Sequence, residues 1–162
     1  MHPLTMLQAL ALLTLANGAP VVAKRLFGAH FTQPVDAGVL FFDGRPVFGP
    51  SKTIRGILAA LLATTAGATL LGLSPAVGAL VASGAMAGDL LSSFTKRRWG
   101  RRPSSRALGL DQVPESLLPL WACRGMLGLT AADVALAVAI FFVGEVVLSR
   151  LLYKAHLRDE PY

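Results

Sequence analysis

Residues 56–88 have the sequence GILAALLATTAGATLLGLSPAVGALVASGAMAG, without a single Asp, Glu, Lys or Arg. A helix that crosses a bilayer takes about 20 predominantly apolar residues. The stretch is therefore too long for one crossing and suits two, and the turn signals Gly72-Leu73-Ser74-Pro75 divide it. It predicts two transmembrane helices, over residues 54–73 and 76–94.

The composition of the whole chain agrees with a membrane protein. Hydrophobic residues make up 54% of the 162 positions, charged residues make up 15%, and the mean hydropathy is +0.59. Soluble domains carry about 25% charged residues, so a soluble bundle with buried helices is the less favoured alternative. We expect an all-α, polytopic integral membrane protein with a single transmembrane domain over residues 1–162.

Three further apolar segments, at 4–23, 114–129 and 131–153, bring the expected number of spans to five. Long loops at 24–53 and 95–113 connect them, and Thr130 is a candidate N-cap for the last span. A cleaved signal peptide is the alternative for residues 1–20. It is disfavoured because no basic segment precedes the apolar stretch.

The lysines and arginines predict the orientation, because they concentrate in cytoplasmic loops. Most of them lie in the two long loops and in the tail after residue 153, whereas the turns around Ser74 and Thr130 contain none. Five spans with the N-terminus outside and the C-terminus cytoplasmic satisfy every loop. We expect a multi-pass protein of the cell membrane whose active face is cytoplasmic.

Small residues predict close contacts between the spans. Gly84 and Gly88 form a small-xxx-small pattern, which is typical of closely packed helices in lipid. Such packing is compatible with a homodimer as well as with a monomer. The lone Cys123 excludes an intramolecular disulfide, and its apolar neighbours favour a packing role.

A polar cluster interrupts the end of the third expected span. Asp89, Ser92, Ser93 and Lys96 recur at helical spacing and would share one face, and Arg97 and Arg98 follow. Basic residues at a helix end can simply anchor it at the membrane interface. That explanation leaves the acid within the span unexplained, and polar residues inside a membrane are functional candidates.

The loop before the second span contains several turn signals, including Asp43-Gly44 and Gly49-Pro50, which predict an ordered, folded-back structure. It ends in Ser51-Lys52-Thr53 at the expected start of a helix. Helix N-terminal N–H groups together with a lysine and hydroxyls can bind phosphate. The spaced glycines of a Walker A loop are absent.

A third cluster begins the fourth span, where Asp111 and Glu115 stand one helical turn apart. Mg²⁺ binds one or two carboxylates together with substrate phosphates, although Asp111 can equally be a helix N-cap. Acids beside many basic residues at a membrane face indicate phosphoryl or nucleotidyl transfer to a lipid. The histidines are scattered and form neither a metal-spaced pair nor a serine–histidine–acid set.

The same residues carry a family resemblance along nearly the whole chain. The chain resembles the archaeal CDP-archaeol synthases, membrane cytidylyltransferases related to the CDP-diacylglycerol synthases. The matching segments are Ala16–Pro20, Pro34–Gly38, Phe42–Gly49, Ser51–Gly56, Gly88–Arg98, Leu110–Gln112 and Leu152–Lys154 with Pro161.

This resemblance implies a five-span fold with a polar cavity open to the cytoplasm. It also implies transfer of a cytidylyl group from CTP to a membrane lipid phosphate, releasing pyrophosphate with Mg²⁺ as cofactor. The implied partners are CTP, the lipid phosphate and the bilayer, with no nucleic acid.

The resemblance also implies roles for individual residues, with Asn17 facing the cavity from a break in the first span. The implied catalytic residues are Asp43, Lys52, Asp89, Lys96 and Asp111, of which Asp89, Asp111 and Asp43 would hold the metal. The implied substrate-binding residues are Asn17, Asp36, Gly44, Arg45, Thr53, Arg55, Ser92, Ser93, Arg97, Arg98, Gln112 and Glu115.

The chain departs from the family pattern at two places. After Leu110-Asp111-Gln112 the family commonly has another Asp and an aromatic residue, whereas this chain has Val113-Pro114-Glu115, so Glu115 is a candidate replacement. Ser149-Arg150 stands where an Asn is more usual. An ether and an ester lipid phosphate both stay open. The rival functions are a CTP-dependent lipid-alcohol kinase and a non-catalytic lipid-binding or transport protein.

Overall fold

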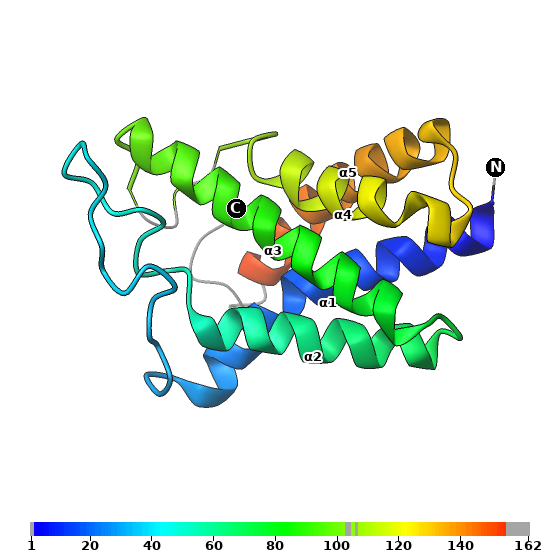
Figure 1. Ribbon diagram of the computed structural model, residues 1–162, viewed down its shortest axis with the longest axis horizontal. Coiled ribbons are helices and arrows are strands. Elements are labelled where there is room, and N and C mark those ends of the chain that lie inside the picture. Colours follow the sequence, from blue (N-terminus) through cyan, green and yellow to red (C-terminus); the bar gives the residue numbers. More distant parts are fainter. Residues whose placement is uncertain (1, 103–104, 106, 155–162) are drawn as a thin grey trace.

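The computed structural model describes residues 2–102, 105 and 107–154. In that part of the chain it contains five helices and no β-strand, apart from isolated bridges in the first long loop (Figure 1). The all-α prediction is confirmed, and each helix lies close to an expected span. The helices are α1 (Pro3–Phe27), α2 (Ile54–Leu70), α3 (Pro75–Arg98), α4 (Gln112–Leu127) and α5 (Ala131–Lys154).

Three of these helices are long and apolar enough to cross a membrane: α1, α3 and the Ala131–Ser149 part of α5. Helix α2 is also apolar but has only 17 residues. Helix α4 has 16 residues and contains Pro119 and Arg124. The structure thus supports a multi-pass membrane protein.

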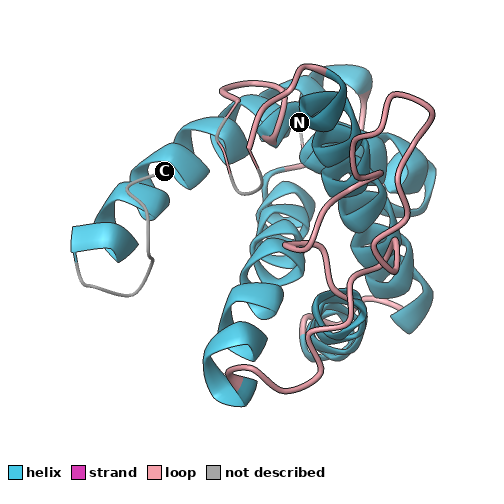
Figure 2. Cartoon of the chain, turned by 90° about the vertical axis from the view of Figure 1, so that its left-hand side faces the viewer, coloured by secondary structure: helices cyan, strands magenta, loops and turns pink. Residues whose placement is uncertain are grey.

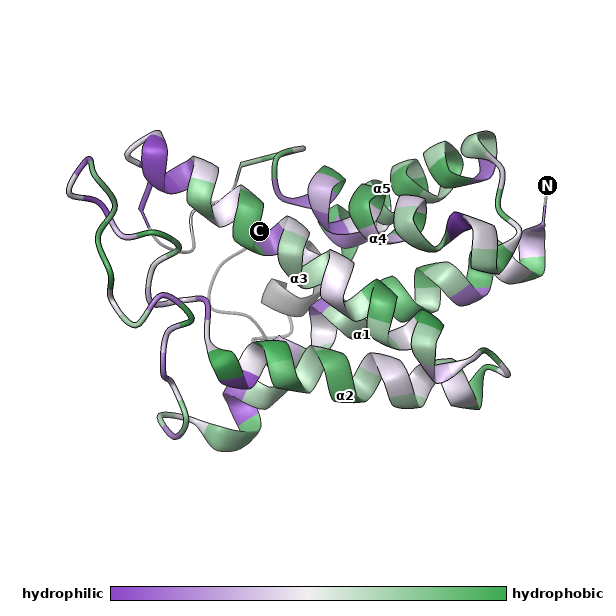
Figure 3. Ribbon diagram, in the orientation of Figure 1, coloured by the Kyte–Doolittle hydropathy of each residue, from purple (hydrophilic) through white to green (hydrophobic). Residues whose placement is uncertain are grey.

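The helices run along the long axis of the molecule and divide it into two unlike ends (Figure 1). The loop after α1 lies at one end, where α3 also terminates, and the short turns 71–74 and 128–130 lie at the other. Hydrophilic residues concentrate at the end with the long loop (Figure 3). The functional candidates of the sequence are therefore gathered at one end of the bundle.

Local sequence explains where the helices stop and start. Gly72 adopts a positive φ of 74°, and the Ser74 hydroxyl then accepts a hydrogen bond from the Val77 N–H to cap α3. Thr130 caps α5 as expected: its hydroxyl accepts from the Asp133 N–H, while the Asp133 carboxylate accepts from the Thr130 N–H. This reciprocal pair is a capping box.

Helix α1 differs from what the family resemblance implies, which is a break in the first span at Asn17. The helix is continuous to Phe27 and includes Pro20. The Asn17 side-chain amide donates to the carbonyl oxygen of Leu13, one turn earlier, at 3.0 Å. The expected break was wrong, because this amide bonds within the helix and Pro20 is accommodated without ending it.

The apolar core lies towards the end with the short turns and includes residues from all five helices, with Leu12, Val81, Leu120 and Val134 among the most buried. Helices α3 and α4 approach most closely at the predicted small residues. A Cβ added at Gly88 would lie 2.4 Å from the Pro114 carbonyl, and one added at Gly84 would lie 2.7 Å from the Pro119 Cα. This close packing fixes the position of the first half of α4 relative to the second half of α3.

Candidate active site

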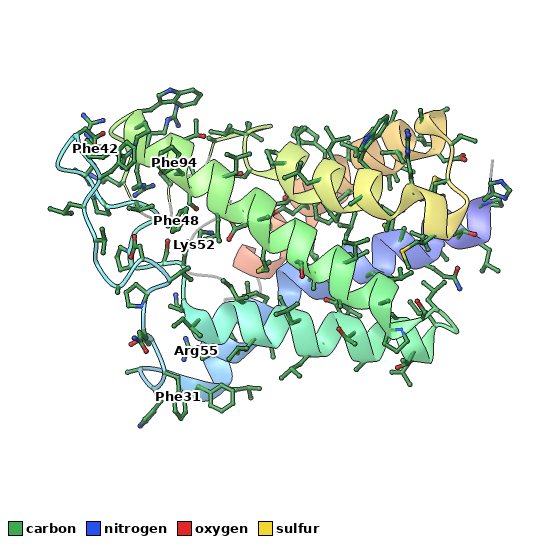
Figure 4. All side chains as sticks on the ribbon, in the orientation of Figure 1. Phe31, Phe42, Phe48, Lys52, Arg55 and Phe94 are labelled. Carbon is green, nitrogen blue, oxygen red and sulfur yellow. The ribbon has the colours of Figure 1, made fainter. Side chains whose placement is uncertain are left out.

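A polar cavity of about 650 Å³ opens at the end of the bundle that carries the long loops. Helices α1 to α5 all contribute to its wall, together with the loop segment before α2 and the one before α4. Figure 4 shows Lys52 and Arg55 at this end of the molecule. The view in Figure 2 shows the loops crossing the helix ends. The site residues that line the cavity are Asn17, Lys52, Thr53, Arg55, Asp89, Ser93, Lys96, Arg97, Asp111, Gln112 and Glu115.

An ion pair joins the first long loop to α3 inside this cavity. The Lys52 ammonium lies 2.6 Å from the Asp89 carboxylate, and each side chain keeps about a fifth of its surface exposed, 22% and 21% respectively. Burial alone would lower the pKa of Lys52. Attraction to Asp89, and further to Glu115 and Asp111, outweighs burial and raises the pKa of Lys52 above its usual value. Lys52 therefore keeps its positive charge at neutral pH and is paired directly with Asp89.

Two of these carboxylates face each other across the α3–α4 contact. Asp89 and Glu115 lie within interaction distance, and Glu115 is 6% exposed. Their proximity follows from Gly88, where the absence of a side chain lets the α4 backbone approach. Neighbouring acids at a partly buried site repel one another unless a cation lies between them.

The second ion pair closes the cavity from the α4 side. Lys96 lies 2.6 Å from Asp111 and also donates to the Ser105 carbonyl oxygen. The Asp111 carboxylate accepts a hydrogen bond from the Ala107 N–H. Asp111 does precede α4, but its side chain makes no capping hydrogen bond. Its carboxylate therefore lines the cavity and does not cap the helix.

Arg97 is a buried cation with unused donors. It is 4% exposed, and its Nη2 donates to the Arg102 carbonyl oxygen at 2.7 Å. Its Nε and Nη1 atoms have no hydrogen-bond partner among the described residues. Buried donors without partners are costly, so an anion in the cavity would satisfy them.

The start of α2 supplies side chains rather than a backbone cradle. The Thr53 hydroxyl caps the helix by accepting from the Gly56 N–H, and the Ile54 N–H donates to the Gln33 carbonyl oxygen. Arg55 donates to the Gly28 and His30 carbonyl oxygens, which fastens the chain after α1. Phosphate binding at this point would therefore rest mainly on Lys52 and Arg55.

Another group of predicted residues lies outside the cavity wall and organises the first long loop. The Asp36 carboxylate accepts N–H hydrogen bonds from Gly38, Phe48 and Gly49. Burial alone would raise the pKa of Asp36, but these three donors lower it below its usual value. Asp36 thus acts on the site through the shape of the loop.

The tip of this loop is fastened to the end of α3. Asp43 pairs with Arg98 at 2.6 Å, and Gly44 supplies a positive φ of 73° at the turn. Arg45 donates to the Arg97 and Arg98 carbonyl oxygens at the C-terminal end of α3. The Arg98 guanidinium also stacks on Phe41 and Phe94. Asp43, Gly44, Arg45 and Arg98 are thus not brought together with Asp89 and Asp111.

Hydrogen bonds position two further predicted site residues, Ser92 and Gln112. The Ser92 hydroxyl lies 2.7 Å from the Leu110 carbonyl oxygen, so Ser92 joins α3 to the second loop while Asp89, Ser93 and Lys96 line the cavity. The Gln112 side-chain oxygen accepts from the Gly109 N–H. Both residues support the segment that carries Asp111.

The cavity wall also contains residues outside the predicted set: Lys24 and Arg25 of α1, and Glu145 and Ser149 of α5. The two basic residues had been interpreted only as orientation signals. Glu145 is an acid within an apolar span, a signal that marks functional candidates in membrane helices. Nothing in the sequence shows that α5 returns to the same cavity.

The donor set fits Mg²⁺ bound jointly with a phosphate. In the described residues no group of three or more His, Cys, Asp or Glu side chains is placed to hold a metal by itself. Asp89, Glu115 and Asp111 nevertheless line one cavity beside abundant basic side chains. Mg²⁺ commonly takes one or two carboxylates and completes its shell with water and phosphate oxygens.

Comparisons with known proteins point to one family. A family model described as CarS-like, CDP-archaeol synthase, matches residues 73–162. A CDP-archaeol synthase of Pyrobaculum calidifontis is 34% identical over 91% of this chain and 90% of its own length. One from Hyperthermus butylicus is 40% identical over 66% of each chain.

A solved structure has the same fold. It is described as an intramembrane enzyme for archaeal membrane lipids biosynthesis, with a TM-score of 0.70 and 32% identity. The match covers 85% of this chain and 90% of that one. Its coverage extends well beyond the segment matched by the family model.

Proposed function

The chain belongs to the CDP-archaeol synthase family, and on that premise we propose that it transfers a cytidylyl group from CTP to the phosphate of a membrane lipid. The products are a CDP-activated lipid and pyrophosphate, and Mg²⁺ is the cofactor. The observation that carries the proposal is the cavity in which Lys52 faces Asp89, Glu115 and Asp111 within a basic wall.

The reaction needs no nucleophile from the protein. A phosphate oxygen of the lipid attacks the α-phosphorus of CTP, and the bond from that phosphorus to the oxygen bridging to the β-phosphorus breaks. The electron pair leaves with pyrophosphate. Such transfers depend on positioning and on neutralising phosphate charge. The buried or partly buried cations of the cavity wall that can do this include Lys52, Arg55, Lys96 and Arg97.

Asp89 and Glu115, with Asp111 beside them, would hold Mg²⁺ together with the phosphates of CTP. When bound, the ion neutralises phosphate charge and favours departure of pyrophosphate. Asp43 instead orders the loop through Arg98, which it contacts outside the cavity wall. The proposal therefore assigns the metal to the acids of the α3–α4 contact.

We further propose that all five helices span the membrane, with the N-terminus outside and the cavity cytoplasmic. The one-sided distribution of the long loops and of hydrophilic residues supports this. Helices α2 and α4 are about 25 Å long at 1.5 Å per residue. They approach the roughly 30 Å hydrocarbon thickness when their adjoining turns are included.

The relatives favour an ether lipid, because those reported above are CDP-archaeol synthases or an enzyme of archaeal membrane lipids. The preferred substrate of this chain is accordingly an archaeol-type lipid phosphate rather than an ester phosphatidate.

The test is turnover by purified protein with CTP, Mg²⁺ and a panel of ether and ester lipid phosphates, read by mass spectrometry. Cytidylyl transfer places the label of α-labelled CTP in the lipid and that of γ-labelled CTP in pyrophosphate. Label from γ-labelled CTP in the lipid would instead identify a kinase. Absence of any labelled lipid across the panel would overturn the proposed activity.

A further inference from the structure

A second cavity, of about 460 Å³, lies between α1 and α5. Helix α5 leans away from the rest of the bundle towards its C-terminal end (Figure 2). The wall of this groove is largely apolar, and the described residues that form it all belong to these two helices. The wall residues that it does not share with the polar cavity are Leu10, Thr14, Gly18, Val22, Ile140, Phe141, Gly144 and Leu148.

The groove continues into the polar cavity. Five wall residues belong to both: Asn17, Val21, Arg25, Glu145 and Ser149. Helices α1 and α5 run in the same direction, so these shared residues mark the end of the groove nearest the long loops. A molecule lying in the groove would therefore have one end at the polar cavity and the other among apolar side chains.

The outer side of the groove is exposed and apolar. Val22 is 54% exposed, Ile140 is 42% exposed and Leu148 is 43% exposed. In a membrane-spanning bundle, such a surface faces lipid. A hydrocarbon chain could enter sideways from the bilayer without exposing its CH₂ groups to water, which would be unfavourable.

Two glycines keep the groove wide. A Cβ added at Gly18 or at Gly144 would meet no atom within 4 Å. These glycines therefore do not serve close helix packing, unlike Gly84 and Gly88, where an added Cβ would collide with α4. The space beside them is free for a ligand.

We propose that the α1–α5 groove holds a hydrocarbon chain of the lipid phosphate substrate and delivers its phosphate past Arg25 into the polar cavity. Gly144 limits the bulk of the chain that the groove accepts. The inference rests on the proposed cytidylyl transfer for the identity of its occupant, and it assigns the chain-binding part of that site.

The first experiment compares Gly144→Phe with wild type on a long-chain and a short-chain lipid phosphate of the same headgroup. Because the added ring would occupy open space rather than the core, the protein should fold and bind CTP. We expect kcat/KM for the long chain to fall about tenfold more than for the short chain, a usual size for changes in an apolar pocket. Equal losses on both substrates would overturn the inference.

Gly125→Phe is the matched control. Gly125 is an exposed glycine of α4 with open space around its Cβ, and it lines neither cavity. The ratio of long-chain to short-chain kcat/KM should stay at the wild-type value. A fall of that ratio equal to the one in Gly144→Phe would show a general effect of added bulk and would also overturn the inference.

A binding measurement separates this inference from the proposed reaction. A long-chain lipid phosphate with a photoreactive group at the end of its chain should label α1 near Leu10 and α5 near Ile140. Excess unlabelled long-chain lipid phosphate should suppress the labelling, as should Gly144→Phe. Labelling elsewhere, or labelling that competitor leaves unchanged as for bulk lipid, overturns the groove assignment whether or not turnover is seen. Absence of turnover with specific groove labelling overturns only the cytidylyl transfer.

Discussion

Lys52 and Asp89, 37 positions apart in the chain, meet at 2.6 Å and tie the first long loop to α3. Neither residue would be placed in the cavity by its own helix or loop alone. Lys52 depends on the loop fold that Asp36 organises, and Asp89 depends on the α3–α4 contact at Gly88. The Lys52–Asp89 ion pair therefore depends both on the fold of the first long loop and on the α3–α4 contact.

Asp89→Asn should abolish CTP turnover while the protein stays folded. The substitution keeps the shape of the side chain but removes the charge that faces Lys52 and that would hold Mg²⁺. We expect a loss of at least about 100-fold in kcat, comparable with removal of a key electrostatic group. Initial rates at saturating CTP and Mg²⁺, beside gel filtration and thermal unfolding in detergent, would measure both properties.

Asp43→Asn is the matched control for that substitution, since Asp43 pairs with Arg98 outside the cavity wall and is 39% exposed at its side chain. Partly exposed ion pairs contribute about 1 kcal/mol or less. We expect less than a tenfold loss of kcat. A large loss in Asp43→Asn beside normal turnover in Asp89→Asn would reverse the metal assignment made here.

Because the pKa of Lys52 is raised, we expect that this residue causes no change in the affinity for CTP with pH in the neutral range. A group whose folded pKa is raised contributes stability fully below its unfolded pKa, about 10.4 for lysine, and loses it as pH rises through the folded value. The affinity for CTP should therefore not fall between pH 6 and 9 on account of Lys52. Calorimetric titration of CTP across that range measures it.

Lys52→His brings the titration into an accessible range, because an unperturbed histidine has a pKa of about 6.5. Affinity for CTP in this variant should fall as pH rises from 6 to 8, whereas wild type stays level. A variant with wild-type affinity throughout would show that the Lys52 charge does not contribute to nucleotide binding.

The sequence predicts the helices well because the positions of helices depend on local features of the sequence. Apolar run length, the Ser74 and Thr130 caps and the glycine at 72 suffice to place the spans near their observed bounds. The apolar run also predicts one span through Pro20, as observed, and the break at Asn17 that the resemblance implies is absent because the Asn17 amide bonds back to Leu13 within the helix.

The site is predicted less completely because it depends on how separate segments meet. Asp36, Asp43 and Asp111 all lie in loops beside turn signals and look alike in sequence. Only the fold shows that Asp36 bonds within the loop and that Asp43 pairs with Arg98 of α3. Asp111, in contrast, pairs with Lys96 in the cavity. The contribution of Glu145 likewise depends on the return of α5 to α1.

Asp36→Asn should loosen the first long loop. The amide keeps an oxygen acceptor but loses the charge that strengthens hydrogen bonds from Gly38, Phe48 and Gly49. We expect a loss of about 1–2 kcal/mol in unfolding free energy and a higher KM for CTP. Denaturant unfolding in detergent and steady-state kinetics would measure these two effects.

The lowered pKa of Asp36 gives the same substitution a pH signature. A depressed carboxyl pKa contributes stability above the unfolded value of about 3.9, and that stability is lost as pH falls through the folded value. Asp36→Asn should therefore remove part of the acid destabilisation of wild type below pH 4. Identical acid profiles for the two proteins would contradict the role given to this carboxylate.

Gly88→Ala should damage stability and activity together, because the new Cβ would lie 2.4 Å from the Pro114 carbonyl. Overpacking of this kind typically costs about 1–3 kcal/mol, and the shift would separate Asp89 from Glu115. Gly125→Ala, where the Cβ meets open space, should change neither property. Thermal unfolding and kcat of both variants decide the point, and a neutral Gly88→Ala would contradict the close α3–α4 contact.

Glu115→Gln should raise the Mg²⁺ concentration needed for half-maximal rate, by about tenfold or more if Glu115 is a direct ligand. Stability should not fall, because removing a carboxylate that faces Asp89 relieves repulsion between them. Two measurements separate metal affinity from turnover. The first is the dependence of the rate on Mg²⁺ concentration, and the second is direct binding of Mn²⁺ monitored by electron paramagnetic resonance. Glu115→Asp, which shortens the side chain but keeps the charge, should recover part of the affinity. If Glu115→Gln binds Mn²⁺ as wild type does while Asp111→Asn does not, the metal pair is Asp89 with Asp111, and Glu115 has a different role in the cavity.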